Sequence, residues 1–213
     1  PGFLVNRILG PYLNEAGHLL TECGDIEGID RAYVAFGMPM GPLRLLDEIG
    51  LDVAQKAGRV LSEAFGERVQ PSPVVERLVA EGRLGKKSGR GFYVHPEGSK
   101  GKPTPDATVL ALLGVDRRPG DASEIVERGV ALMIAEATRC LDDETVGSAG
   151  ELDLAMIMGT GFPPFRGGLL RHADSWGATT VVGRLATFRD RLGSRFEIPP
   201  GLTADRRFYP PRV

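Results

Sequence analysis

The chain has 213 residues, of which 42% are hydrophobic and 25% are charged, and its formal net charge is −2. This length and composition predict a globular protein with one large domain or two smaller ones of about 100 residues. The near-neutral charge argues against a nucleic-acid-binding surface, and no apolar run approaches the roughly 18 residues of a membrane span.

The sequence begins Pro1-Gly2 without an initiator Met, and it lacks the charged region and cleavage site of a signal peptide. We therefore expect a piece of a longer, cytoplasmic protein. Cys23 and Cys140 are expected to be reduced thiols. The histidines lie far apart in the sequence and none has an evident acidic partner, so we expect neither a metal site nor a histidine-based catalytic pair. These residues are His18, His95 and His172.

Helical periodicity dominates the first part of the chain. Apolar residues at helical spacing over residues 5–20 predict a first helix that Gly24 ends, and a second helix is predicted over Ile26–Phe36. The Gly- and Pro-rich residues 37–42 forbid helix continuation. Apolar spacing then predicts one or two helices over residues 43–65, with Gly50 as a joint.

The end of this first part is less regular. A short helix is predicted over residues 74–80, a Gly- and Lys-rich loop over 85–91 and a brief extended segment over 92–94. Residues 96–105 are polar and rich in Gly, Pro and Lys, which indicates a domain boundary.

The helical pattern then repeats. Eight stripe positions recur 121 residues later, over residues 126–141. Glu136-Ala137 matches Glu15-Ala16, Leu152-Asp153 matches Ile29-Asp30, and residues 159–165 form a second Gly/Pro break. We expect an internal repeat of two helical units, with a first domain over 1–96, a linker over 97–120, a second repeat over 121–197 and an extended tail over 198–213.

The motifs of several enzyme classes are missing. No G-x-G-x-x-G follows a strand, and Gly159-Thr160-Gly161 is followed by Phe-Pro-Pro, which cannot cradle a pyrophosphate at a helix start. No P-loop and no G-x-S-x-G elbow occurs. From the residues alone, the chain is an all-helical tandem repeat that serves as a binding or dimerisation module.

Several strings resemble the 3-hydroxyacyl-CoA dehydrogenases. Residues 1–7 (PGFLVNR) resemble the opening of that family's C-terminal domain, residues 37–52 its next signature, and residues 85–93 (GKKSGRGFY) the segment that closes its first repeat. Residues 99–103, 161–168 and 209–211 are similar to the α subunits of bacterial multifunctional fatty-oxidation complexes, in which an enoyl-CoA hydratase domain precedes the dehydrogenase. The resemblance runs nearly end to end.

The resemblance implies an all-α fold of two tandem repeats, each like the helical C-terminal domain of 6-phosphogluconate dehydrogenases. It also implies a reaction in fatty-acid β-oxidation. NAD accepts a hydride from C3 of a 3-hydroxyacyl-CoA, and a histidine oriented by a glutamate removes the hydroxyl proton. The NAD-binding domain and this His–Glu pair would precede residue 1. No catalytic, cofactor-binding or metal-binding residue is therefore expected here, and the chain alone is predicted to be inactive.

Two residues are expected to bind substrate. Asn6 matches the family asparagine near the reacting end of the substrate, and its amide can donate to a carbonyl or oxyanion. The second unit has Glu127 at this position, so only the first unit is expected to serve an active site. Met158 stands where the bacterial complexes have a substrate-contacting tyrosine, and it offers apolar contact without the hydroxyl. A buried or capping Asn6 and a core Met158 are the alternatives. Phe3, Met38 and Met40 are further candidates for contact with substrate, and core packing is the favoured interpretation for them.

The expected partners are an acyl-CoA substrate, the missing NAD-binding domain and a thiolase subunit; nucleic acid is not expected. An apolar face left by the missing domain would favour self-association. One alternative function is a helical module that assembles a thiolase-containing complex, which acyl-CoA and thiolase pulldowns would separate from substrate binding. Another is a different dehydrogenase of the 6-phosphogluconate type, which residues 161–168 and the tandem repeat argue against.

Overall fold

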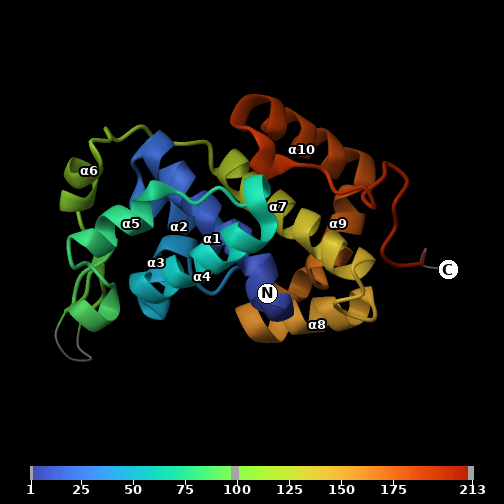
Figure 1. Cartoon of the computed structure of the whole chain (residues 1–213), viewed down its shortest axis with the longest axis horizontal. Helices are drawn as coiled ribbons and strands as arrows, with labels where there is room; N and C mark the ends of the chain where they lie inside the picture. Colours follow the sequence, from blue (N-terminus) through green and yellow to red (C-terminus); the bar gives the residue numbers. More distant parts are fainter. Residues whose placement is uncertain (1, 97–100, 211–213) are drawn as a thin grey trace.

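The computed structural model describes residues 2–96 and 101–210, apart from the side chain of Glu67, and it is helical, as the sequence predicts (Figure 1). The first helices follow the predicted pattern closely, including the break at residues 37–42 and the joint at Gly50. The elements of the first unit are α1 (Phe3–Cys23), α2 (Ile26–Phe36), α3 (Pro42–Ile49), α4 (Leu51–Phe65), η1 (Gly66–Arg68), α5 (Pro73–Ala80), η2 (Lys86–Ser88) and β1 (Tyr93–Val94).

The second unit repeats this order of helices. Its elements are α7 (Ala122–Asp142), α8 (Ala149–Thr160), η3 (Pro164–Arg166), α9 (Leu169–Trp176), α10 (Ala178–Leu192) and η4 (Ser194–Phe196). The equivalent helices have equal lengths in three cases: 21 residues in α1 and α7, eight in α3 and α9, and fifteen in α4 and α10. The all-α class and the tandem arrangement are therefore confirmed.

The segment expected to be a linker contains two elements. β2 (Thr104–Pro105) pairs antiparallel with β1, and α6 (Thr108–Leu113) packs against α5. Asp106 anchors the start of this helix, since its carboxylate accepts hydrogen bonds from the Thr108 amide and hydroxyl and pairs with Arg83 and Arg90. Much of the expected linker is thus packed on the first unit, while residues 97–100 lie outside the described part.

The two longest helices, α1 and α7, pack against each other at the centre of the molecule (Figure 1). Close approach depends on Gly129 of α7, because a Cβ there would meet the Tyr33 hydroxyl and the Tyr12 ring. The Tyr33 hydroxyl instead reaches the backbone and donates to the Ile125 carbonyl at 2.6 Å. Neighbouring apolar side chains of both units are fully buried and form one continuous core.

The contact between α1 and α7 is reciprocal. Arg7 of α1 bonds Glu136 of α7 at 2.6 Å, and Arg128 of α7 bonds Glu15 of α1. The two arginines are 121 residues apart, as are the two glutamates, so each unit gives the other the same pair of groups. This is the pattern of an isologous dimer interface, built here within one chain.

A second equivalence lies at the start of α3 and α9. Asp30 accepts hydrogen bonds from the Leu43 and Arg44 amides and from the Tyr93 hydroxyl. Asp153 accepts the same three bonds in the second unit, from the amides of residues 170 and 171 and from the Tyr209 hydroxyl. The carboxylates satisfy amides that a helix start leaves without partners.

The tail closes the second unit as β1 closes the first. The amides of residues 208 and 209 donate to Asp174, just as those of residues 92 and 93 donate to Asp47. Residues 198–210 are largely non-helical, and they make defined contacts with the second unit. Residues 211–213 lie outside the described part.

Candidate substrate site

A cavity of about 690 Å³ lies in the first unit between α1, α4 and the segment that leads to α5. Its walls are largely apolar. The apolar and small lining residues come from α1 (Leu9, Gly10 and Leu13), α3 (Leu46 and Ile49), α4 (Val53, Ala54, Ala57, Gly58, Val60 and Leu61), the segment after α4 (Val69) and α5 (Val75). Small-molecule sites have this size and composition, with few polar groups that fix orientation.

Asn6 is one of those polar groups. It lines the cavity and is exposed, and its side chain forms no hydrogen bond with any residue of the described part. It lies one turn into α1, within the first third of a helix that Gly2 precedes in a left-handed conformation (φ 86°). The helix start is not capped by a side chain, so a capping role for Asn6 is excluded. Its amide is free to donate to a carbonyl or a developing oxyanion.

The equivalent position in the second unit is not free. Glu127 accepts a hydrogen bond from Arg184 of α10 at 2.9 Å and another from Ser123 at 3.1 Å. An ion pair thus occupies the place that the free amide holds in the first unit. The two units therefore differ in polarity and pairing at this position.

Met158 lies on α8 and is 79% exposed, so it is not a core residue. It does not line the cavity that contains Asn6. Met158 nonetheless lies on a helix that packs on α1. A Cβ on the adjacent Gly159 would lie 3.1 Å from Val5 of α1. The two expected substrate residues therefore flank one helix junction without sharing a cavity.

Three further aromatic and sulfur residues were expected in the core. Met38 is buried and Met40 is half-buried, but Phe3 is 91% exposed. The core expectation for Phe3 is therefore wrong, although the neighbouring Leu4 packs against the core. Leu154, Met158 and Phe165 are also exposed. Exposed apolar groups of this size mark surfaces that bind other molecules or domains.

One histidine has an acidic partner that the sequence did not reveal. The His95 Nε2 atom lies 2.8 Å from the Oδ2 atom of Asp47, and both side chains are buried. The partners are 48 residues apart and meet only because β1 returns to α3. Asp47 also accepts hydrogen bonds from the Phe92 and Tyr93 amides at the end of the first unit. The His95–Asp47 pair therefore holds this segment in place, and its hydrogen bonds do not involve Asn6.

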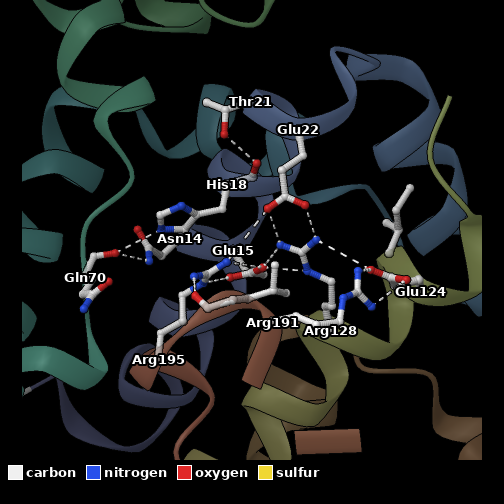
Figure 2. A network of polar contacts seen from close by, with 12 residues as sticks. Asn14, Glu15, His18, Thr21, Glu22, Gln70, Glu124, Arg128, Arg191 and Arg195 are labelled. Carbon is white, nitrogen blue, oxygen red and sulfur yellow. Dashed lines mark hydrogen bonds and ion pairs between the residues drawn. The ribbon is translucent and has the colours of Figure 1, made fainter. Parts of the chain in front are cut away.

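The other histidines differ from each other. His18 is half-buried, and its Nε2 atom lies 3.2 Å from the Gln70 carbonyl oxygen (Figure 2). His172 is buried against Phe36, Phe162 and Trp176, and its Nε2 atom has no partner in the described part of the chain. Burial lowers the pKa of His172 to about 4, and nearby Arg166 and Arg184 act in the same direction.

The carboxylates that cap α3 and α9 are also perturbed. Burial raises the pKa of Asp30 to about 6 against the opposing effect of its hydrogen bonds, and burial raises the pKa of Asp153 as well. Both side chains are fully engaged by amides and a tyrosine. Their altered pKa values therefore reflect a structural role in each unit.

Two absences concern the described residues only. Across residues 2–96 and 101–210, no three His, Cys, Asp or Glu side chains gather as a metal ion would require. Within the same residues, no helix is both long and apolar enough to cross a membrane.

Comparison with known proteins identifies the family. A family profile described as "3-hydroxyacyl-CoA dehydrogenase, C-terminal domain" matches residues 2–95. The matched residues are less than half of the chain. The match covers the unit that holds Asn6 and the cavity, so the resemblance of the first unit to this domain is confirmed.

Longer curated relatives extend the similarity to both units. "Fatty acid oxidation complex subunit alpha" of Shewanella sp. (strain ANA-3) is 43% identical over 209 residues, which are 95% of this chain and 29% of the relative. The protein of the same name from Shewanella baltica (strain OS155) is 43% identical over 199 residues, which are 92% and 28% of the two chains. The chain thus spans less than a third of the length of these curated relatives.

Two solved dehydrogenase structures share the fold. A 3-hydroxybutyryl-CoA dehydrogenase from Escherichia coli K12 superimposes with a TM-score of 0.76 at 26% identity, over 95% of this chain and 59% of its own. The dehydrogenase part of multifunctional enzyme 1 from C. elegans gives a TM-score of 0.69 at 21% identity, over 95% and 47% of the two chains. This second likeness concerns the fold alone.

The sequence had not revealed the α4 wall of the cavity. Ala54, Ala57 and Gly58 lie within the helix predicted over residues 43–65, and nothing in the sequence pattern singled them out. Their small size was the available indication, since the residues aligned with them in α10 are Val181, Arg184 and Leu185.

Proposed function

We propose that this chain is the substrate-side and packing part of an NAD-dependent 3-hydroxyacyl-CoA dehydrogenase of fatty-acid β-oxidation. The observation that carries the proposal is the free amide of Asn6 at an apolar cavity, within residues that belong to this dehydrogenase family. In this role Asn6 donates to the oxygen on C3 of the substrate, where negative charge develops as the hydroxyl loses its proton.

The nicotinamide cofactor does not fit this chain. A dinucleotide site needs a strand, a Gly-rich turn and a helix start in succession, and the helices described here begin after no such strand. When bound elsewhere in the full-length protein, NAD would accept the hydride from C3. The residues of this chain position the thioester and exclude water from it. We therefore propose that the NAD domain and its His–Glu pair lie in another part of the protein.

The second unit, in this proposal, supports the first. Its α7 forms the reciprocal ion pairs with α1 and fixes the helix that bears Asn6. Met158 adds apolar contact from the adjoining α8. The two buried free thiols, Cys23 and Cys140, support a reducing, cytoplasmic location.

The test is an NADH-coupled assay with 3-hydroxyacyl-CoA substrates on the full-length protein that contains this chain. Asn6→Ala is expected to lower kcat/KM by about 10²-fold, the usual effect of removing one donor to a developing oxyanion. Glu127→Gln, the matched change in the second unit, is the control and should leave kcat/KM within about twofold. This chain alone should give no NAD-dependent turnover. NAD-dependent activity of the isolated chain would contradict the proposal. A full-length protein without this activity would contradict it as well.

A thiolase subunit is a second proposed partner. The relatives are named as subunits of a complex, and the exposed apolar residues Phe3, Leu154, Met158 and Phe165 offer surface for a protein partner or for the NAD domain. Where neither is present, the same residues would favour self-association. Co-purification of a thiolase subunit with the full-length protein checks this role, and clean separation of the two proteins at micromolar concentration would argue against it.

A further inference from the structure

We infer that Asn14 and His18 of α1 are positioning residues, which hold residues 69–73 in place as one wall of the substrate cavity. This inference rests on the proposed function and adds to it the groups that keep the cavity in shape. It is based on the hydrogen bonds of residues 69–73, called the wall segment below, and on a comparison with the second unit.

The wall segment connects η1 to α5 and has few hydrogen bonds of its own. Four of its residues line the cavity: Val69, Pro71, Ser72 and Pro73. The two prolines have no amide hydrogen. No backbone–backbone hydrogen bond between described residues involves residues 70–72. The position of the wall segment therefore depends on side chains of a neighbouring helix.

Asn14 supplies two hydrogen bonds to this segment. Its Nδ2 atom donates to the Gln70 carbonyl at 2.7 Å (Figure 2). Its Oδ1 atom accepts from the Ser72 amide, also at 2.7 Å. Only one orientation of the Asn14 amide allows both bonds. Since both ends of the amide are engaged, Asn14 lines the cavity as a support for the wall segment.

His18 lies one turn further along α1 and contacts the same carbonyl. Its Nε2 atom lies 3.2 Å from the Gln70 oxygen, and this nitrogen bears the proton because a carbonyl oxygen only accepts. Burial lowers the pKa of His18, which favours the neutral ring at pH 7. Gly17 permits the close approach of the segment, since a Cβ there would lie 2.5 Å from the Ser72 hydroxyl oxygen.

The repeat identifies the equivalent segment of the second unit. α4 and α10 each have fifteen residues and each follows an eight-residue helix and a glycine, Gly50 or Gly177. Residues of α4 therefore align with residues of α10 at an offset of 127, and Gly66 and Gly193 keep this offset at the ends of the two helices. Along α1 and α7 the offset is 121, as the reciprocal ion pairs establish.

The second unit holds its segment through a charged residue. His18 aligns with Arg139, and the Gln70 position aligns with Glu197. Arg139 donates to the Glu197 carbonyl at 2.9 Å and pairs with the carboxylate of the same residue at 3.4 Å. A bond from the first helix to this carbonyl is thus common to both units.

The other contacts of the wall segment have no counterpart. Asn14 aligns with Ala135, which is buried and has no polar side chain. Gly17 aligns with Thr138, whose hydroxyl donates to a carbonyl of its own helix. The second unit therefore lacks both the amide that bonds twice and the glycine that lets the segment lie close. These features occur in the unit with the cavity, which assigns them to the site and not to the shared scaffold.

The second unit also braces the wall segment from the other side. The Gln70 side-chain amide donates to the Ser194 hydroxyl at 3.2 Å, and η1 packs on η4. The next residue of η4, Arg195, bonds Glu15 of α1 at 2.8 Å (Figure 2). Gln70 is thus held through its backbone by α1 and through its side chain by the second unit.

A fixed wall lowers the cost of substrate binding. A loose wall segment would lose conformational freedom when the substrate binds, which raises KM without slowing the chemical step. Two hydrogen bonds of ordinary net strength correspond to roughly a tenfold change in binding. In the full-length protein, Asn14→Ala is therefore expected to raise KM for 3-hydroxydecanoyl-CoA about tenfold and to leave kcat within about twofold.

Three further variants separate positioning from a general loss of stability. His18→Gln keeps a donor for the Gln70 carbonyl and should stay within about twofold of the parent KM, while His18→Leu removes the donor and should raise KM about threefold. Arg139→Leu is the matched control, because it removes the equivalent donor from the second unit and does not touch the cavity. It should leave KM within about twofold.

Hydrogen exchange of the full-length protein measures the wall segment directly. The Ser72 amide donates to Asn14, and the prolines on either side of Ser72 contribute no amide hydrogen. Asn14→Ala should speed exchange in the peptide that contains residues 69–74, and added 3-hydroxydecanoyl-CoA should slow it again. Arg139→Leu should leave this exchange unchanged.

An unchanged KM in Asn14→Ala overturns the inference, and so do unaltered exchange in residues 69–74 or an equal rise of KM in Arg139→Leu. The proposed function has its own readout in Asn6→Ala. If Asn6→Ala lowers kcat/KM as expected and Asn14→Ala leaves KM unchanged, the dehydrogenase role stands and the positioning role does not. A parent protein without turnover overturns the proposed function, and the exchange of residues 69–74 still decides whether Asn14 holds the wall segment.

Discussion

The first and second units share one scaffold and differ in how their fourth helix covers their first. In the second unit α10 packs on α7 through Val181, Leu185 and Phe188, and an ion pair closes the contact. In the first unit α4 covers α1 through fewer buried side chains and leaves a cavity that contains a free amide. On one shared scaffold, side-chain size therefore decides whether the fourth helix packs fully on the first or leaves an open pocket beside it.

The two units share the residues that hold their helices together. Each caps its third helix with a buried aspartate, Asp30 or Asp153, that also accepts a tyrosine hydroxyl from the end of its unit. Each contributes one arginine and one glutamate to the central helix contact. The differences include the positions that line the cavity, and changes to either the common or the differing groups test what each contributes.

The largest effect is expected where the common ion pairs are removed. Arg128 is 1% exposed and bonds Glu15 and Glu22, with Glu124 nearby (Figure 2). Arg128→Met should lower the free energy of unfolding by about 3 kcal/mol, because the buried Glu15 then keeps only Arg195, at 2.8 Å, and Glu22 loses the arginine it bonds most closely. Urea denaturation followed by circular dichroism measures this loss.

Arg7→Met is the matched change in the first unit and should have the smaller effect, about 2 kcal/mol. Removal of Arg7 leaves Glu136 with Arg139 at 3.4 Å, and Asp143, its other partner, is mostly exposed. Equal losses in the two variants, or a larger one for Arg7→Met, would show that the reciprocal pairs are equivalent in energy as well as in position. A double-mutant cycle on Arg128 and Glu15 separates the pair energy from the loss of side-chain packing.

Much of this fold was predictable because helices have a local period. The stripe of α1, the bounds of α2, the joint at Gly50 and the second stripe of α7 follow from apolar spacing within short windows. α6 and β2 were not predicted, since six and two residues are too few to establish a period. The His95–Asp47 contact joins residues 48 positions apart, and no local pattern encodes it.

The candidate site was only half predictable. Asn6 carries a family motif and an edge position on its helix, both of which lie in the sequence. The cavity depends on which side chains of α1 and α4 face each other. Its comparison with the second unit was hidden, because the repeat offset changes from 121 along α1 to 127 along α4. Gly58 and Leu185 therefore do not align at the offset that reveals the repeat.

A smaller effect is expected at a position where the units differ in polarity. His172 aligns with Leu45 and is buried with an unpartnered Nε2 atom. Its folded-state pKa, about 4, is lower than its ordinary value near 6.5. The neutral ring therefore contributes stability above pH 6.5 that is lost as the pH falls toward 4, because the unfolded chain binds the proton first.

His172→Leu places in the second unit the residue that the first unit has, and it should remove this acid sensitivity. From pH 7 to pH 5 the parent chain should lose about 1–2 kcal/mol of unfolding free energy more than the variant. Asp30 acts in the opposite direction in both proteins, since its raised pKa of about 6 favours the folded state on acidification, so only the difference between them reports on His172. Parallel urea titrations at pH 7, 6 and 5 measure it. Parallel pH profiles for the two proteins would mean that the ring is solvated or paired in solution, and that this position does not distinguish the two units electrostatically.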